Sequence, residues 1–178
     1  MPANVEIKAR IESVAALLPR ALAFAEDPPQ LIHQDDTFFA VPHGRMKLRV
    51  FGDGSGELIH YQRLDHDGPK LSDYVLVPIH APDPLRLALT RACGQIGRVR
   101  KHRTLLLAGQ TRIHLDEVEG LGSFLELEVV LHDGQTEAEG HTIALALLAE
   151  LGLGADQLVA GAYLDLLGGQ GSGPGVDT

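Results

Sequence analysis

Short segments in which apolar and polar residues alternate recur along this chain, and this pattern is typical of strands that bury one face. In NVEIKARI, residues 4–11, four apolar side chains alternate with Asn, Glu, Lys and Arg. Turn-forming stretches such as GDGSG at 52–56 separate neighbouring segments, and short connections of this kind join antiparallel strands. The pattern predicts strands at residues 4–11, 37–41, 45–51, 57–63, 71–79, 98–107, 110–118 and 123–131.

Helical signals interrupt these strands. Ser13 is a candidate N-cap of one helix, and Thr136 with Glu139 forms a capping box for another. A chain of 178 residues with 44% hydrophobic residues is long enough to bury one core. We therefore expect a single α+β domain at residues 1–167, followed by a flexible Gly-rich tail at residues 168–178.

The polar faces of the predicted strands are unusually ionic. In RMKLRVF, for example, Arg45, Lys47 and Arg49 stand at alternate positions. A face in water normally mixes charged and neutral side chains, because like charges on adjacent strands destabilise a sheet. Since the chain is acidic overall, with a formal charge of −9, gathering its cations on one sheet face favours binding of a compact polyanion. Eight of the fifteen basic residues share this phase: Lys8, Arg10, Lys47, Arg49, Arg63, Lys101, Arg103 and Arg112.

This charged face also constrains the architecture. Eight antiparallel strands can close into a barrel whose interior holds one small ligand. If the helices pack on the apolar outer face, the charged face becomes the lumen, where Arg and Lys can clamp phosphate oxygens. We therefore expect a closed eight-stranded antiparallel β-barrel, or tunnel, with a charged lumen and helices packed outside.

Carboxylates share the phase of these cations. Glu126 and Glu128 lie two residues apart on one predicted strand, and Glu6 would join them if the first and last strands meet. Carboxylates among basic side chains suit Mg²⁺ or Mn²⁺, hard cations that bridge protein oxygens to phosphates. The pattern therefore predicts a divalent metal site beside the phosphate-binding cations.

Several motifs together resemble the CYTH domains, also called triphosphate tunnel metalloenzymes. NVEIK at 4–8 is similar to the family motif Glu-x-Glu-x-Lys in its last two fixed positions, and Asn4 stands where the motif has its first Glu. Further similar stretches are GRMKLR, YQR, GPKLSDY and RKHRTLLLAGQTRIHLDEVEGLGSFLELE. The resemblance covers residues 4–167, and its later part is most similar to the class IV adenylate cyclase branch.

The resemblance implies roles for most of these residues. Those implied to bind a triphosphate are Lys8, Lys47, Arg49, Arg63, Lys101, Arg103 and Arg112, with Lys70 as a looser match and Arg10 added for its position two residues from Lys8. The implied metal ligands are Glu6, Glu126 and Glu128, with Asp116 near them. The implied catalytic residues are Glu6, Lys8, Glu126 and Glu128. Because Asn4 stands where the family motif has a Glu, this chain lacks one carboxylate. The resemblance implies that this carboxylate is a ligand for a second metal or a base for an attacking water.

Three functions are compatible with this pattern. The first is a class IV-type adenylate cyclase that converts ATP to cyclic AMP and pyrophosphate. The second is a triphosphatase that hydrolyses inorganic triphosphate, thiamine triphosphate or a nucleotide. The third is a catalytically weak module that binds triphosphates or polyphosphate, and Asn4 is the feature that favours it.

Bulk properties argue against other classes. The charge of −9 argues against a binder of duplex nucleic acid, and the chain lacks the run of about 20 apolar residues that a membrane span needs. Because Cys93 is the only cysteine, no intramolecular disulfide can form, which fits a reducing cytoplasm. A homodimer is plausible by the resemblance.

Overall fold

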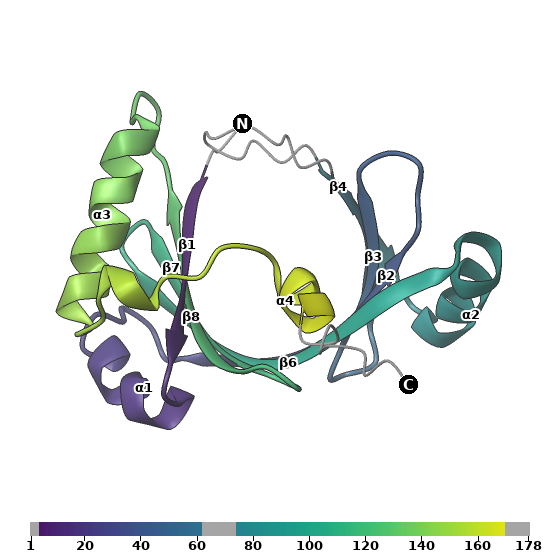
Figure 1. Ribbon diagram of the computed structural model, residues 1–178, viewed down its shortest axis with the longest axis horizontal. Helices are drawn as coiled ribbons and strands as arrows, with labels where there is room; N and C mark the ends of the chain where they lie inside the picture. The colour runs from purple at the N-terminus through teal and green to yellow at the C-terminus, as the bar shows by residue number, and fades with distance from the viewer. Residues whose placement is uncertain (1–3, 62–73, 170–178) are drawn as a thin grey trace, which may run out of the picture.

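The computed structural model describes residues 4–61 and 74–169. Within them, eight antiparallel strands form one strongly curved sheet in the order β1-β8-β7-β6-β2-β3-β4-β5 (Figure 1). The predicted strands are all present, and most bounds agree with the sequence pattern within a few residues. They are β1 (Asn4–Ile11), β2 (Gln30–Phe39), β3 (Arg45–Phe51), β4 (Gly56–Tyr61), β5 (Tyr74–Ile79), β6 (Gln95–Ala108), β7 (Thr111–Val118) and β8 (Gly122–Val130).

The first and last strands of the chain are neighbours in the sheet, which is the condition under which Glu6 would join Glu126 and Glu128. β1 pairs with β8 in a register that places Glu6 opposite Glu128 and Lys8 opposite Glu126. Residues opposite one another in an antiparallel pair project to the same face. This pairing therefore brings the predicted metal ligands of both strands onto one side of the sheet.

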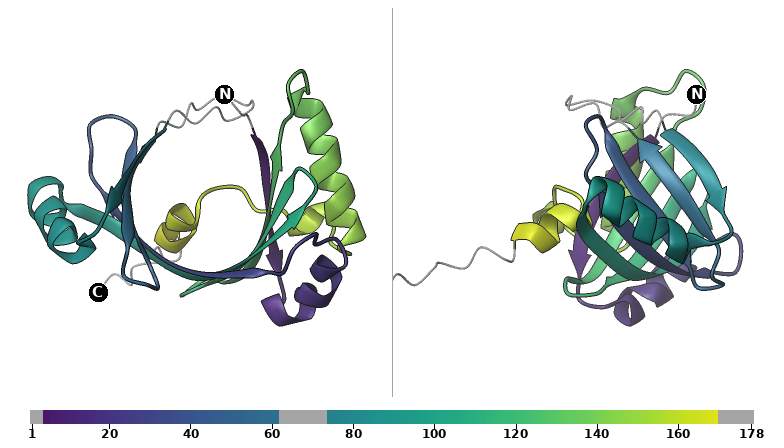
Figure 2. Two further views of the ribbon diagram at one scale, coloured as in Figure 1. Left: turned by 180° about the vertical axis from the view of Figure 1, so that it is seen from behind. Right: turned by 90° about the vertical axis from the view of Figure 1, so that its right-hand side faces the viewer.

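β1 and β5 are the edges of the sheet. Among the described residues no backbone hydrogen bonds join these two strands. The sheet curves so that β1, β7 and β8 form one wall and β2, β3 and β4 form the wall facing it (Figure 1; Figure 2, left). An eight-stranded antiparallel sheet is thus confirmed, whereas its closure into a barrel stays a prediction.

Three helices cover the outer, convex face of the sheet, as expected: α1 (Val14–Leu22), α2 (Pro82–Cys93) and α3 (Glu137–Glu150). Between α1, α3 and the sheet lies the largest apolar core, and burying each large side chain there contributes about 1.5–3 kcal/mol. Its sheet residues occupy the apolar phase of the predicted strands: Leu106, Ile113, Leu115, Leu125 and Leu127.

The predicted helix caps are present. The Ser13 hydroxyl accepts a hydrogen bond from the backbone N–H of Ala16 at the start of α1. Thr136 and Glu139 form the capping box of α3. Each cap satisfies backbone donors that a helix start would otherwise leave unpaired.

The C-terminal helix corrects the expectation that all helices lie outside. After a short 3₁₀ turn, η1 (Ala155–Gln157), the chain enters the concave side of the sheet and forms α4 (Tyr163–Gly169) there (Figures 1 and 2). Tyr163 packs in an apolar cluster with Val99, Val118 and Phe124, which lie on the inner face at one end of the sheet. The charged face therefore ends in an apolar patch that the sequence pattern did not reveal, and α4 buries it.

Gly97 permits this close approach of α4 to β6. A Cβ atom at residue 97 would lie 2.2 Å from Leu164 Cδ1. α4 continues through Gly168 and Gly169, the first residues of the predicted tail, and residues 170–178 lie outside the described part. In the described part, no helix is both long and apolar enough to cross a membrane.

Candidate functional site

The inner face of β6 and β7 carries a buried carboxylate surrounded by cations. Asp116 is completely buried and accepts hydrogen bonds from Lys101 Nζ at 3.0 Å and from Arg103 Nε and Nη2, both at 2.7 Å. The Tyr163 hydroxyl of α4 donates a further hydrogen bond to Asp116 at 3.0 Å. Burial alone would raise the pKa of Asp116, but the hydrogen bond from Arg103 and the charge of Lys101 lower it. Asp116 is thus an ionised partner that fixes the directions of two predicted phosphate-binding cations.

Arg103 links this carboxylate to the predicted metal ligands on β8. Its Nη2 atom donates to Glu126 Oε2 at 2.6 Å, and Lys8 Nζ lies 3.4 Å from Glu126 Oε1. His114 places Nδ1 3.6 Å from Glu126. Burial would raise the pKa of Glu126, but His114 and the nearby cations hold it well below its usual value. Lys8, Arg103 and Glu126 therefore form one network across β1, β6 and β8.

A second cationic cluster lies on the facing wall and centres on Asp36 of β2. Asp36 accepts hydrogen bonds from Lys47 Nζ at 2.8 Å and from Arg49 Nε and Nη2, both at 2.8 Å. The pKa of Asp36 is far below its usual value, because these cations outweigh the effect of burial. Burial lowers the pKa of Lys47 to about 8 against the attraction of Asp36, and repulsion from Arg49 and Lys101 adds to the lowering. Because these cations repel one another, the cluster favours the binding of an anion.

The remaining predicted metal ligands lie beside Asn4. Within the described residues no hydrogen bond or ion pair engages the Glu6 carboxylate, and its pKa is raised by burial and then by the negative charge of Glu126. Asn4 Nδ2 donates a hydrogen bond to Glu128 Oε1, and Arg112 Nη1 lies 3.2 Å from the same oxygen. The amide that replaces the family carboxylate thus contacts a predicted metal ligand directly.

The oxygen ligands of the predicted metal site fit a hard divalent cation. The carboxylates of Glu6, Glu126 and Glu128 are oxygen ligands on one face of the sheet. Burial is the main cause of the raised pKa of Glu6, and the negative charge of Glu126, which a bound cation would offset, adds to it. In the present side-chain arrangement, no three metal-ligating residues of the described ranges converge on one point. Lys8 and Arg103 take the oxygens of Glu126, and Asn4 and Arg112 take one oxygen of Glu128, so metal binding would require these contacts to rearrange.

Arg10 and Arg112 lie apart from the two cationic clusters around Asp36 and Asp116. Arg10 donates to the backbone oxygen of Leu121 at 2.9 Å and stacks on the Phe124 ring, at the end of β1. Arg112 is largely exposed beside Glu128. Arg63 and Lys70 lie outside the described residues.

Sequence reasoning missed Tyr163 and left the role of Asp36 open. The sequence pattern could place Asp36 near a tunnel mouth but explained it equally well as part of a loop, because the predicted strand began at Thr37 rather than at Gln30. The alternation across Gln34, Asp36 and Phe38 is the signal that could have found it. Tyr163 carried no such signal, because its place on the inner face depends on the path of the chain after α3.

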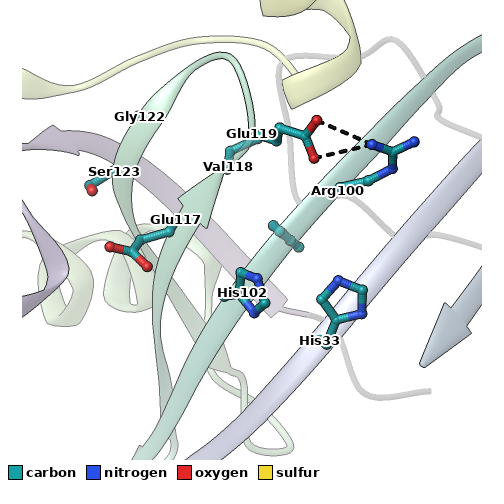
Figure 3. Close-up of a pocket in the computed structure, with 9 residues that line it drawn as sticks. His33, Arg100, His102, Glu117, Val118, Glu119, Gly122 and Ser123 are labelled. Atoms are coloured by element: carbon teal, nitrogen blue, oxygen red, sulfur yellow. Dashed lines mark hydrogen bonds and ion pairs between the residues drawn. The ribbon is translucent and has the colours of Figure 1, made fainter. Parts of the chain in front are cut away.

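A separate cavity of about 340 Å³ lies on the outer face of the sheet (Figure 3). His33 and His102 line it with ring centroids 4.8 Å apart. Arg100 and Glu119 point toward each other there and form hydrogen bonds of 3.1 and 3.3 Å. Lys101 also lines this cavity, but its Nζ atom donates to Asp116 on the inner face. Since Arg100 and Glu119 pair with one another, the cavity lies beside the cationic site and is not part of it.

Comparisons with known proteins find the same fold among solved structures. No curated protein sequence matches the chain. The solved structure of the PH1012 protein from Pyrococcus horikoshii is 20% identical, with a TM-score of 0.79 over 94% of this chain and 99% of that one. A proposed adenylate cyclase from Vibrio parahaemolyticus is 20% identical, with a TM-score of 0.73 over 93% of this chain and 98% of that one. The proposed adenylyl cyclase HpAC1 from Hippeastrum, described as having a dominant triphosphatase activity, is 15% identical, with a TM-score of 0.68 over 96% of each chain.

At these identities the solved structures show a shared fold. The family model for the CYTH domain matches residues 2–163, which is nearly the whole of the described chain. Its span contains both cationic clusters, the carboxylates of β1 and β8, and Tyr163 of α4. The chain belongs to the CYTH domain family.

Proposed function

We propose that this protein is a divalent-metal-dependent enzyme that acts on triphosphates, and that its reaction is the cyclisation of ATP to cyclic AMP and pyrophosphate. The observation that carries the proposal is the pair of cationic clusters on one concave surface, the first on β1 and β6 and the second on β3. One cluster contains Lys8, Lys101 and Arg103, and the other contains Lys47 and Arg49. A linear triphosphate has negative charge along its whole length and can contact both walls at once.

The cations are held in place before substrate arrives. Asp36 and Asp116 each fix two cations through short hydrogen bonds, so these side chains need little rearrangement to receive phosphate oxygens. Arg49 and Arg103 would contribute paired N–H donors, whereas Lys47 and Lys101 would contribute point charges. Closure of the sheet by β1 and β5 around the bound triphosphate, which would make a tunnel, is part of this proposal.

The metal would bind through Glu6, Glu126 and Glu128, with Asp116 as a further predicted ligand behind Arg103. Mg²⁺ or Mn²⁺ would neutralise charge on the phosphate oxygens. Asp116 already satisfies three donors, so its main effect in this conformation is to orient Lys101 and Arg103. Asn4 holds one oxygen of Glu128 and supplies no negative charge, which favours a single metal over two.

Cyclisation requires the ribose 3′ oxygen to form a bond to the α-phosphorus while the bond from that phosphorus to the pyrophosphate oxygen breaks. The hydroxyl proton is released, and pyrophosphate leaves with the electron pair of the broken bond. Such phosphoryl chemistry depends mainly on positioning and on fixed positive charge. Lys8, Lys101 and Arg103 would stabilise the charge that develops on the leaving group, and the opposite wall would keep the chain of phosphates straight.

Hydrolysis of a triphosphate is the second candidate, and the triphosphatase activity named for the structurally similar HpAC1 favours it. The same cations would hold the substrate while water attacks a terminal phosphorus. Asn4 favours a third candidate, a binding module with weak catalysis, because it removes a carboxylate that could orient the water.

Product analysis separates these candidates. The full chain would be incubated with Mg²⁺ or Mn²⁺ and with ATP, tripolyphosphate or thiamine triphosphate, and the products resolved by ion-exchange chromatography. Cyclic AMP with an equal amount of pyrophosphate supports the cyclase, and free phosphate supports the hydrolase. Tight binding without turnover supports the binding module, and the absence of both binding and turnover rejects the proposal.

A further inference from the structure

Two histidines lie side by side on the outer face of the sheet, in the cavity shown in Figure 3. His33 of β2 stands directly opposite His102 of β6, and their ring centroids are 4.8 Å apart with the ring planes tilted by 48°. Cβ atoms of residues opposite one another in an antiparallel pair lie about 4.5–5.5 Å apart. The backbone pairing of β2 with β6 therefore holds the two imidazoles next to each other.

The ring nitrogens of this histidine pair are available to a ligand. Within residues 4–61 and 74–169, no hydrogen bond or ion pair engages either imidazole. The buried His114 differs, because its Nδ1 lies 3.6 Å from Glu126 and its Nε2 lies 3.9 Å from Glu128. His102 is exposed and His33 is half-buried, so an ion from solvent can reach the pair through the cavity of about 340 Å³.

The charges around the histidine pair do not exclude a cation. Arg100 lines the same cavity, but its Nη1 atom donates to both carboxylate oxygens of Glu119, at 3.1 and 3.3 Å. The Nζ atom of Lys101 is on the inner face, 3.0 Å from Asp116. Glu117 adds an exposed carboxylate to the lining. The cavity thus has no uncompensated positive charge among the described residues.

The separation of the two rings fits two nitrogen ligands of one metal ion. With metal–nitrogen bonds of about 2.1 Å, two imidazoles on one ion have centroids about 4.6 Å apart at a right angle and about 5.3 Å apart at the tetrahedral angle. The observed 4.8 Å lies between these values. Imidazole nitrogen suits Cu²⁺, Ni²⁺ and Zn²⁺, whereas Mg²⁺ and Mn²⁺ prefer oxygen ligands.

We infer that His33 and His102 form a binding site for a divalent ion late in the first transition series, Cu²⁺, Ni²⁺ or Zn²⁺, with water as the remaining ligands. This site and the predicted carboxylate site for Mg²⁺ or Mn²⁺ lie on opposite faces of the sheet. A bound ion would join β2 to β6, the pair at which β1, β8, β7 and β6 meet β2, β3, β4 and β5. It would therefore stabilise the junction between the two halves of the sheet, whether or not the protein acts on triphosphates.

Metal titrations of the untagged, full-length protein test this assignment. Binding of Ni²⁺ and Zn²⁺ would be measured by calorimetry in excess Mg²⁺, so that the inner carboxylates are occupied. His33→Ala and His102→Ala each remove one proposed ligand, and circular dichroism without metal checks that each variant is folded. His141→Ala is the matched control, because it removes an exposed histidine from α3.

We expect the unmodified protein to bind one equivalent of Ni²⁺ or Zn²⁺ that both His33→Ala and His102→Ala bind at least tenfold more weakly. His141→Ala and Glu126→Gln should bind this equivalent as the unmodified protein does. Cu²⁺ should bind more tightly than Ni²⁺ or Zn²⁺, and electron paramagnetic resonance of the Cu²⁺ complex should show two nitrogen ligands. Bound Zn²⁺ should raise the melting temperature of the unmodified protein but not that of His102→Ala.

Unchanged binding in both histidine variants, or no binding of any of the three ions, would overturn the inference while leaving the proposed function intact. A loss in only one of the two variants, or a Cu²⁺ spectrum with one nitrogen ligand, would show that the histidines do not bind as a pair. Binding that is lost in Glu126→Gln and kept in both histidine variants would assign the ion to the inner carboxylates, which also overturns the inference.

Discussion

The Asp36 carboxylate accepts two hydrogen bonds from the Arg49 guanidinium, each 2.8 Å long. Lys47 donates to the same carboxylate, so one buried anion directs two cations into the concave face. On the facing wall, Asp116 acts on Lys101 and Arg103 in the same way. Each wall thus contains a carboxylate that orients the groups proposed to bind substrate.

Replacing Asp36 by Asn should destabilise the protein in a ligand-dependent way. The variant keeps the shape of the side chain but leaves Lys47 and Arg49 without their buried counter-charge, which costs about 3 kcal/mol in the free energy of unfolding. Bound tripolyphosphate supplies negative charge and should restore stability more in the variant than in the unmodified protein. Urea denaturation with and without tripolyphosphate measures both effects.

Asp35→Asn provides the matched control. Asp35 lies next to Asp36 but on the outer face, where it pairs with the partly exposed Arg98. We expect a smaller loss of about 1 kcal/mol that tripolyphosphate does not reverse, because exposed pairs are weaker. Equal responses of the two variants to tripolyphosphate would contradict the assignment of Asp36 to the binding site.

Substrate affinity should fall as the pH rises through about 8. Burial lowers the pKa of Lys47 to about 8, so its ammonium group is charged at pH 7 and largely neutral at pH 9. Binding of an anionic triphosphate then requires uptake of a proton, and the KM should rise by up to about tenfold over this interval. Lys47→Arg keeps the charge and should flatten the profile of KM against pH, whereas an unchanged profile would show that another group titrates.

Glu126→Gln should abolish most metal-dependent turnover. The substitution removes a charged oxygen ligand and weakens the contact to Arg103, so we expect kcat to fall about 100-fold or more. Glu117→Gln, on the outer face of β7, is the matched control and should retain full activity. Chelation with EDTA should stop the unmodified enzyme, and added Mg²⁺ should restore it. A fully active Glu126→Gln variant would refute the proposed metal site.

The melting temperature of the Asn4→Glu variant should depend more strongly on bound metal than that of the unmodified protein. The new carboxylate would face Glu128, so without metal the like charges should lower the melting temperature by a few degrees. With Mg²⁺ both carboxylates become ligands, and the metal-induced rise in Tm should exceed that of the unmodified protein. Asn4→Gln keeps the amide and serves as the control. Identical Mg²⁺-induced shifts in all three proteins would count against a metal beside Glu128.

The sequence alone determined the strands, their inward phase and the caps of α1 and α3. These features depend on the periodicity and side-chain chemistry of short segments. The tertiary contacts of this protein are consistent with those local preferences. The pairing of β1 with β8 was anticipated only as a condition, because Glu6 would join Glu126 and Glu128 if the first and last strands met.

Only the tertiary structure decided how the charged face is organised. Strand periodicity shows which side chains share a face, but it does not show which cation contacts which carboxylate. The orienting roles of Asp36 and Asp116 are therefore visible only in the tertiary structure. The same holds for α4, whose apolar side could have packed on either face of the sheet. It lies inside because Val99, Val118 and Phe124, on three different strands, come together there to bury Tyr163.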